Sequence, residues 1–343
     1  MKTSSLVVLA VLSSSACSPF ASALRSPSSS NIQAAGNEAA AMVQAMQMQA
    51  TMQKAKDAAS QKCDPILKRE IGWVEEQYVG TRYSTATLAT MKPIDLDGPL
   101  RPLAARVATV GKVLAAKSSR PNIGWTFGVV QSDTPTSMHH PGGYVFVTTG
   151  LLGRMTNEAQ LAGVLAHEIA HVTQRDGLAS WNKIFHMRCS VAVQAKVMLD
   201  ASAPTDRVAA QFGPIFDQAL NLDWSAQQDS FLKWLFDAML MMQLNLGYER
   251  DAEFNADATA AHLVTFAGYD AAEYEGFVTL LGDQPHHPLA ADRAMKLRNL
   301  REGELASFSG KAKPDLTALV APLRPAPAPG PAPSTAPAPP PKR

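Results

Sequence analysis

The feature that most constrains this chain is the segment His167-Glu168-Ile169-Ala170-His171, which has the pattern HExxH. Two histidines four residues apart in a helix project from one face, so both imidazoles can reach a single metal ion. Glu168 lies beside that pair around the helix, where its carboxylate can contact a metal-bound water without being a ligand. The segment therefore predicts a helix with one face for metal chemistry.

The residues around this motif predict the limits of the helix and its buried face. Thr156 is the expected N-cap, and Asp176-Gly177 is the expected C-terminal end after about residue 174. A different side of the helix carries the apolar residues Leu161, Leu165, Ile169 and Val172. We therefore expect this helix to be buried on one side while it presents the motif on another.

A catalytic zinc site needs three protein ligands and one open position, so a third ligand should come from another helix. Residues 248–257 have the sequence YERDAEFNAD and offer Glu249, Glu253 and Asp257. Spacing alone does not choose among these three carboxylates, and a solvated charged face is the alternative interpretation. Ala256 and Ala260 lie beside them, and small side chains there would let the two helices approach closely.

Composition sets broad limits on the class of protein. The chain has 343 residues, a hydrophobic fraction of 46% and a formal net charge of +1. That length and composition suffice for a substantial core. Nucleic-acid binding usually requires a strongly basic face, so the near-neutral charge argues against a nucleic-acid partner.

The N-terminus indicates export. Lys2 is followed by a short apolar run at 6–12 and then by small residues, which is the layout of a signal peptide over residues 1–23. The alternative is lipoprotein processing before Cys17, although Ser14 departs from the usual aliphatic residue there. We expect a protein of the periplasm or a lipoprotein anchored to the outer membrane through Cys17; a cytoplasmic protein with an apolar first helix is the alternative.

The remaining cysteines, Cys63 and Cys189, could pair in an oxidising compartment or could be two buried thiols. Met42, Met46 and Met48 fall in a helix expected at 33–62, and we expect them to pack on a neighbouring core rather than form a binding face.

The domain organisation follows from shifts in composition. Residues 24–32 are expected to be a flexible tether, 33–310 the folded domain with its core at about 100–300, and 311–343 a disordered Pro/Ala-rich tail. The fold class is α+β and predominantly helical, with helices expected at 64–79, 99–117 and 249–265 and strands at 125–131 and 144–149. Residues 232–246 are apolar but interrupted by charges, which favours a buried or surface helix over a membrane span.

Taken together, these motifs resemble the HtpX/Oma-type zinc metallopeptidases, which are gluzincins related to the CAAX prenyl proteases. The resemblance rests on Pro141-Gly142-Gly143-Tyr144, Gly150-Leu151-Leu152, the HExxH motif and the downstream Arg250-x-x-Glu253-x-x-Ala256-Asp257, and it covers about residues 100–300. It implies a small sheet whose edge strand borders the HExxH helix. The sequence departs from the family pattern at residues 136–140, where His139 and His140 are expected to be loop residues; contact with substrate or with a second metal is the alternative.

The resemblance also implies the roles of individual residues. One Zn²⁺ per chain would be held by His167, His171 and Glu253, with Asp257 orienting a zinc-bound histidine through its second ring nitrogen. His287 would stabilise the oxyanion or close the open zinc position, and His286 is its rival. Arg250 and Arg293 are implied near the ligands.

The implied activity is that of an endopeptidase. Zinc would lower the pKa of a bound water to about 7, and Glu168 would take its proton as the general base. An extended substrate would pair with the strand at 144–149, in contact with Gly143, Tyr144, Val145 and Phe146. The implied substrates are unfolded or misassembled envelope proteins, as in quality control.

Two other functions compete with proteolysis. The first is a latent, zinc-bound, chaperone-like or binding protein of the envelope, closed by His287 as a fourth ligand with the segment after the motif as a lid. The second is a structural envelope lipoprotein that binds envelope protein partners through its Met-rich helix and its tail, with the metal incidental.

Overall fold

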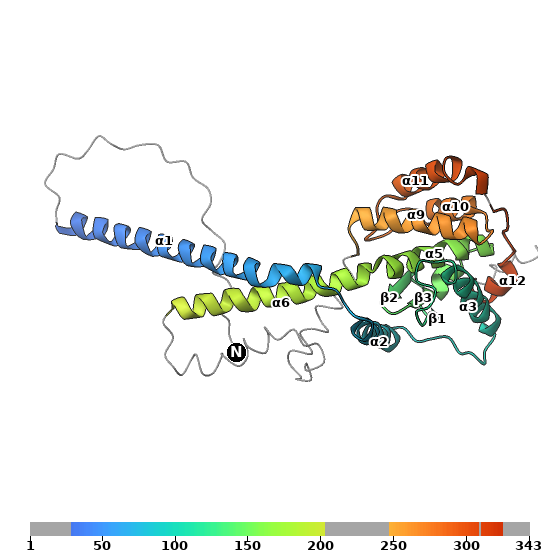
Figure 1. The fold of residues 1–343 in the computed structure, drawn as a ribbon, viewed down its shortest axis with the longest axis horizontal. Coiled ribbons are helices and arrows are strands. Elements are labelled where there is room, and N and C mark those ends of the chain that lie inside the picture. Colours follow the sequence, from blue (N-terminus) through green and yellow to red (C-terminus); the bar gives the residue numbers. More distant parts are fainter. Residues whose placement is uncertain (1–28, 203–246, 309, 325–343) are drawn as a thin grey trace, which may run out of the picture.

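Helices dominate the computed structural model, which describes residues 29–202, 247–308 and 310–324 (Figure 1). A compact domain contains a three-stranded sheet and most of the helices, and two long helices extend away from it. The predicted α+β, predominantly helical class is confirmed. The segment expected to be a signal peptide, which includes Cys17, the helix expected at 232–246 and the Pro/Ala-rich stretch at 325–343 lie outside the described residues. Within the described ranges, every helix is too short or too polar to cross a bilayer.

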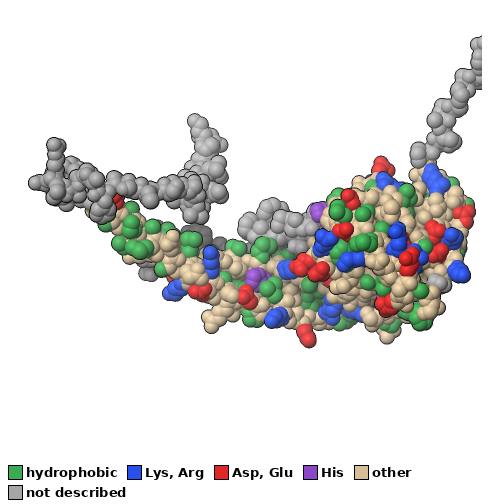
Figure 2. Space-filling model, turned by 90° about the horizontal axis from the view of Figure 1, so that it is seen from above, with side chains coloured by type: hydrophobic (Ala, Val, Ile, Leu, Met, Phe, Trp, Pro, Cys, Tyr) green, Lys and Arg blue, Asp and Glu red, His purple; other side chains and the backbone are tan. Residues whose placement is uncertain are grey.

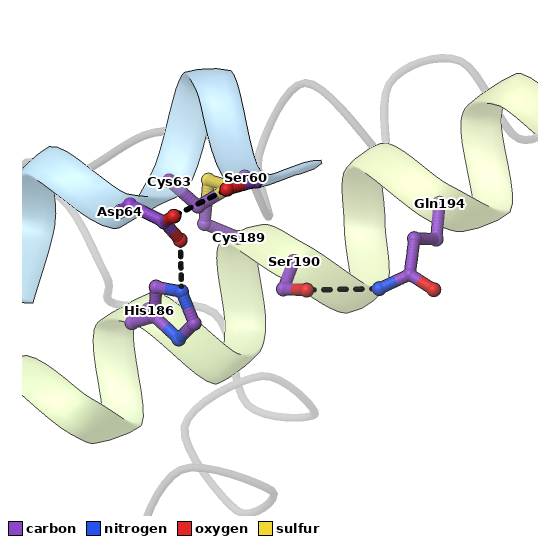
Figure 3. Close-up of a disulfide and its surroundings, with 7 residues drawn as sticks. All are labelled: Ser60, Cys63, Asp64, His186, Cys189, Ser190 and Gln194. Carbon is purple, nitrogen blue, oxygen red and sulfur yellow. Dashed lines mark hydrogen bonds and ion pairs between the residues drawn. A yellow bond between two sulfur atoms is a disulfide. The ribbon is translucent and has the colours of Figure 1, made fainter. Parts of the chain in front are cut away.

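The two long helices form an arm. Helices α1 (Ser29–Cys63) and α6 (Asp176–Ala201) lie side by side and run in opposite directions. A disulfide between Cys63 and Cys189 joins them, which answers the question that the sequence left open (Figure 3). Beside it, Asp64 accepts hydrogen bonds from Ser60 and His186. Helix α1 begins at Ser29, inside the segment expected to be a tether.

A second hydrophobic core surrounds the base of this arm. Its members include Trp181, Ile184 and Phe185 of α6 and Ile66 and Val79 from the segment after α1. Farther out, Met42, Met46 and Met48 are 66%, 55% and 55% exposed. The expectation that these methionines pack on a core is therefore wrong, because the described elements that contact α1 are chiefly α6 and the short turn after α1. Figure 2 shows hydrophobic side chains along the projecting arm.

The chain after the disulfide departs from the predicted helix at 64–79. A 3₁₀ turn, η1 (Asp64–Lys68), comes first, and α2 (Trp73–Thr90) begins after a break. Arg69 and Gly72 have extended backbone conformations, which interrupt the helical path between the two elements. Helix α3 (Arg101–Ala115) agrees with the prediction at 99–117.

The sheet has three strands in the order β1-β3-β2. Strand β1 (Thr126–Val130) pairs in parallel with β3 (Tyr144–Thr148), and β2 (Ser137–His140) pairs with β3 in the antiparallel direction. The expectation that residues 139 and 140 belong to a loop is wrong. Gly142 and Gly143 have φ of +80° and +97°, and these positive values let the chain reverse tightly so that residues 137–140 become a strand.

Helix α5 (Glu158–Gln174) is the central element of the domain and follows α4 (Thr149–Leu152). Helix α3 and the sheet lie on one side of it, and α9 (Arg250–Phe266) and α10 (Ala271–Leu281) lie on the other (Figure 1). Helix α11 (Ala290–Glu302) covers α9 and α10. The predicted apolar face is confirmed, since Leu161, Leu165 and Ile169 are fully buried in the main core.

The capping residues of α5 differ from the prediction, whereas its end at Gln174 agrees with it. Asn157, not Thr156, is the N-cap, and its side chain accepts a hydrogen bond from the backbone N–H of Gln160. At the other end Arg175 has φ of +64° and stops the helix, and α6 begins directly at Asp176. A left-handed residue ends a helix in the same way whether it is Gly or another residue. Gly177 therefore lies inside α6.

Residues 311–324, which were predicted to belong to a disordered tail, are folded against the domain. After η2 (Ala306–Phe308), bridges join Ala312 to Tyr269 and Asp315 to Asn157. Two further short helices, α12 (Thr317–Val320) and η3 (Ala321–Leu323), follow. Leu316 and Val320 are buried in the main core, and this burial holds the segment against the domain.

Candidate metal centre

Helices α5 and α9 bring three candidate ligands together. His167 and His171 project from the same face of α5, as their spacing predicts, and Glu253 projects toward them from α9. Ala256 and Ala260 of α9 are fully buried, so small side chains permit the close approach. One ligand atom from each of the three residues lies within 4.8 Å of the others.

The distances within this cluster suit a small cation. Nε2 of His167 and Nε2 of His171 are 3.1 Å apart. The Glu253 carboxylate lies 3.5 Å from Nε2 of His167 and 3.7 Å from Nε2 of His171. A tetrahedral zinc ion with bonds of about 2.0–2.1 Å separates its ligand atoms by about 3.3 Å. The three residues fit such an ion without rearrangement of their helices.

Each histidine is oriented by a carboxylate on its other ring nitrogen. Nδ1 of His167 lies 3.0 Å from Oδ1 of Asp257, and Nδ1 of His171 lies 2.7 Å from Oδ2 of Asp176. With both Nδ1 atoms donating, a neutral imidazole presents its Nε2 lone pair to the cluster. Two lone pairs and a carboxylate then converge on one point, an arrangement that repels itself unless a cation lies there.

The protonation of the cluster also indicates that a positive charge is needed there. Burial lowers the pKa of His171 to about 4, so this imidazole is neutral at pH 7. Burial also lowers the pKa of His167, but its hydrogen bonds to Asp257 and Glu253 outweigh burial and raise that pKa to about 10. A proton on His167 would then neutralise the carboxylates. A metal cation would take that place and release the proton.

Glu253 keeps an oxygen that the protein does not fully satisfy. Its Oε2 is buried and makes no hydrogen bond of good geometry, although Nδ1 of His287 lies 2.8 Å away. Burial raises the pKa of this carboxyl group, and its contacts with His167 and His287 outweigh burial and hold the pKa well below the usual value. An ionised, incompletely paired, buried carboxylate is suited to binding a cation.

Asp257 is fixed by the helices that cover α9. Arg293 of α11 donates from Nε to Oδ2 at 2.8 Å and from Nη2 to Oδ1 at 2.7 Å. The hydroxyl of Tyr274 donates to Oδ1 at 2.7 Å. Burial raises the pKa of Asp257, and the bonds from Arg293 and His167 outweigh it and hold that pKa far below the usual value. Asp257 therefore contacts His167 and is itself held by Arg293 and Tyr274.

Glu168 lies between the ligand pair and strand β2. The hydroxyl of Ser137 donates to Oε1 at 2.6 Å, and Nδ1 of His139 lies 2.7 Å from Oε2. Burial raises the pKa of Glu168, but the bond from His139 outweighs burial, and the net effect lowers that pKa to about 2. Glu168 is thus ionised at neutral pH and could accept a proton.

The remaining predicted residues have different outcomes. His287 reaches Glu253 as described. His286 has φ of +68° and lines the hollows beside the centre. Arg250 pairs with Asp292 and lies over the ring of Phe254, so the structure does not bring its guanidinium into the cluster.

The predicted substrate strand needs correction. Strand β3 is the middle strand, paired on both sides, and Val145 and Phe146 are 0% and 5% exposed. Residues 143–146 therefore cannot offer a free sheet edge. The edge strand that borders α5 is β2, whose Ser137 and His139 contact Glu168.

Two hollows meet at this edge. One, of about 160 Å³, is lined by residues that include His139, Glu168 and Glu253, and the other, of about 370 Å³, by residues that include His167, Glu168 and Phe277. Both are also lined by Ser137 and by residues 285–287, so the 285–287 loop lies between them. The two hollows provide space beside Glu168 on either side of the candidate centre.

Sequence analysis missed four side chains of this region: Ser137, Asp176, Tyr248 and Tyr274. Ser137 lies in a four-residue strand that the sequence does not predict, and Asp176 was interpreted as a helix end. The alternation of Ser137 and His139 toward one face is the only local signal that could have paired these two residues.

Comparison with known proteins adds a family. The sequence model of peptidase family M48 matches residues 102–301, more than half of the chain. A protein of Vibrio cholerae that carries the name of the beta-barrel assembly-enhancing protease is 26% identical over 251 residues, which are 67% of this chain and 46% of that protein.

Two further relatives are similar over shorter stretches. The mitochondrial metalloendopeptidase OMA1 of Schizosaccharomyces pombe is 30% identical over 169 residues, 49% of this chain and 41% of that protein. The beta-barrel assembly-enhancing protease of Yersinia pestis is 24% identical over 206 residues, 56% of this chain and 38% of that protein. The chain thus spans less than half the length of each of these relatives.

Proposed function

Because the chain belongs to peptidase family M48, we propose that it is a zinc-dependent endopeptidase that cleaves polypeptides. The observation that carries this proposal is the convergence of His167, His171 and Glu253, with ligand atoms within 4.8 Å of one another, beside an ionised Glu168. Two imidazoles and one carboxylate leave an open position at a catalytic zinc.

When bound, zinc polarises the carbonyl of the scissile bond and lowers the pKa of a coordinated water to about 7. The residues of the chain then perform the proton transfers. Glu168 accepts a proton at its carboxylate and passes it to the leaving amine. Asp257 and Asp176 fix the two imidazoles through Nδ1, and Arg293 and Tyr274 in turn fix Asp257.

The substrate pairs with strand β2 in this proposal. Because β2 is a sheet edge and residues 136–140 line a hollow beside Glu168, an extended peptide could add main-chain hydrogen bonds there. Such pairing depends on backbone more than on side chains, which favours unfolded or extended polypeptides.

The proposed setting is the cell envelope. Two of the relatives are named for enhancing beta-barrel assembly, and the Cys63–Cys189 disulfide suits an oxidising compartment. We therefore propose unfolded or misassembled envelope proteins as substrates and export through residues 1–23, with or without a lipid on Cys17.

A latent state is the second candidate, and the position of His287 favours it. The imidazole of His287 lies 2.8 Å from Oε2 of Glu253, and its ring is 5.7 Å from that of His167. In this latent state His287 would occupy the open zinc position and close the site. X-ray absorption of the zinc-loaded protein separates the two states, because three protein ligands and a water indicate an open site and four protein ligands a closed one.

The test of proteolysis is the cleavage of an unfolded protein such as casein. We expect the wild type to cleave it, a chelator to stop cleavage, and zinc to restore it. Glu168→Gln should keep zinc and lose about 10²–10⁴-fold in kcat. Glu304 is an exposed carboxylate after α11 that pairs with His262 of α9, so Glu304→Gln is the matched control and should keep full activity. Equal cleavage by wild type and Glu168→Gln would refute the role of Glu168.

A further inference from the structure

Two side chains of β2 are directed at the proposed general base. Because side chains alternate along a strand, Ser137 and His139 share one face of β2. Ser137 donates to Oε1 of Glu168 at 2.6 Å, and Nδ1 of His139 lies 2.7 Å from Oε2. Each oxygen of the Glu168 carboxylate therefore has its own partner on the edge strand.

The second ring nitrogen of His139 extends this contact. Nε2 of His139 lies 2.8 Å from the hydroxyl of Tyr248, which is two residues before α9. The ring of His139 also stacks on two other rings. Its centroid lies 4.7 Å from that of His171 and 5.3 Å from that of Tyr248. His139 is 7% exposed, so its ring is held in one place by packing as well as by hydrogen bonds.

The hydrogen-bond directions in this chain are consistent. The phenol of Tyr248 has an O–H that can donate to Nε2. A carboxylate oxygen of ionised Glu168 can only accept, so Nδ1 of His139, which faces it, donates in that bond. The order is therefore Tyr248 O–H to Nε2, then Nδ1–H to Oε2.

His140 shows what an ordinary buried histidine does in the same strand. It points to the opposite face, where Nε2 lies 2.9 Å from the hydroxyl of Thr87 and the ring stacks on Tyr83. Its contacts hold α2 against the sheet and do not include Glu168. The two adjacent histidines therefore have different tasks.

We propose that His139 and Tyr248 are positioning residues, which hold the Glu168 carboxylate toward the metal centre in the orientation that proton transfer requires. This inference rests on the proposed peptidase function. Ser137 would hold the other carboxylate oxygen. A carboxylate bonded on both oxygens loses rotational freedom, and a fixed base reacts faster than a mobile one.

The first test measures kcat, KM and zinc content of His139 variants on casein. His139→Ala should lose about 10–100-fold in kcat, with KM and zinc content unchanged. His139→Asn should recover most of that loss, because its amide keeps an N–H near the position of Nδ1. Tyr248→Phe should lose about 2–10-fold, the effect of one hydrogen bond.

Matched controls make the same changes away from the centre. His262→Asn alters a histidine of α9 whose partners are the carbonyl of Ala258 and Glu304. Tyr269→Phe removes a phenol that donates to Glu158 at the opposite end of α5. Both controls should keep kcat within about twofold of the wild type.

Several results would overturn the proposal. Unchanged kcat in His139→Ala means that Glu168 needs no such support, and raised kcat means that the bond restrains an inactive base. A failure of His139→Asn to recover activity assigns the loss to packing rather than to the N–H. If His139→Ala does not fold, Tyr248→Phe decides by the same criterion.

The second test does not depend on activity. Nitrogen-15 NMR of the histidine rings in the zinc-loaded protein should show His139 protonated at Nδ1, with a signal that moves in Glu168→Gln and in Tyr248→Phe. A proton on Nε2 alone, or a signal insensitive to both variants, overturns the proposal. If the wild type cleaves nothing, the proposed function fails, and the NMR result still decides whether His139 holds Glu168.

Discussion

The candidate metal centre and the helical arm are held together by different kinds of interaction. In the centre, charged groups lie inside the main core and satisfy one another, as Asp257 does with His167 and Arg293. In the arm, large apolar side chains such as Met42 remain in solvent, and a covalent bond at Cys63–Cys189 joins the helices. Changes in the centre should therefore affect metal binding and catalysis, whereas changes in the arm should affect stability.

Removal of the proposed third ligand should give the largest effect. Loss of a residue that only orients a metal ligand usually costs up to about 100-fold in metal affinity. We expect Glu253→Gln, which removes a ligand itself, to cost more. Zinc should raise the melting temperature of the wild type and leave that of the variant unchanged. Competition with a chromophoric chelator measures the affinity.

Glu249→Gln is the matched control for that ligand, since Glu249 lies one turn earlier, is exposed and pairs with Lys183. It should bind zinc like the wild type. Equal zinc affinity in the two variants would show that Glu253 is not a zinc ligand, and it would weaken the contrast between the centre and the arm.

Loss of the disulfide should act on the arm alone. Because the bridge joins residues 126 positions apart, replacing both Cys63 and Cys189 by Ser should lower the free energy of unfolding by about 2–4 kcal/mol. Zinc affinity at 25 °C should not change. Urea denaturation measures the first quantity and chelator competition the second.

Ser190→Ala is the control beside the bridge, and its free energy of unfolding should stay within about 0.5 kcal/mol of the wild type. A large loss of zinc affinity in the Cys-free variant would show that the arm and the centre are coupled, contrary to the comparison.

Asp257→Asn should lower zinc affinity or kcat and should not affect the helical arm. The variant leaves Arg293 buried beside a neutral partner and loosens the orientation of His167, so zinc affinity or kcat should fall about 10–100-fold. Asp292→Asn, which removes an exposed ion pair with Arg250, is the control and should change neither quantity by more than about twofold. If both variants behave alike, the bond from Asp257 to His167 has no special role.

The last prediction is a pH dependence of stability that arises next to the centre. Burial lowers the pKa of His140 from 6.5 to about 3. The folded protein therefore keeps this ring neutral, while the unfolded chain binds a proton below about pH 6.5, so stability falls as pH falls from about 6.5 toward 3. Between pH 7 and pH 5 the loss from this group is about 2 kcal/mol.

His140→Gln should remove that part of the slope, and urea midpoints at pH 7 and pH 5 measure it. His262→Gln, at a partly exposed position, should keep the slope of the wild type. An identical slope in His140→Gln would mean that the protonation of another group controls acid stability.

The centre could be predicted from sequence because its groups are organised by local periodicity. The spacing of His167 and His171 fixes their common face whatever the rest of the chain does. Glu253 was one of three carboxylates by spacing, and the family resemblance selected it; the structure then places it against both histidines. Short-range geometry and a combination of motifs were sufficient here.

The rest depends on packing between distant segments. Residues 137–140 have the sequence SMHH, which has little β propensity, and they form a strand because the glycine turn returns the chain along β3. The contacts of His139 with Glu168 and Tyr248 follow from that pairing. The exposure of Met42 depends on the arm extending from the domain, which no local pattern records.

Zinc-edge anomalous diffraction from crystals grown with zinc tests the central claim most directly. We predict one strong peak with Nε2 of His167, Nε2 of His171 and a carboxylate oxygen of Glu253 at about 2.0–2.2 Å, and Glu168 beside it but not bound. Crystals without a peak between α5 and α9, or with a peak whose ligands exclude Glu253, would contradict it.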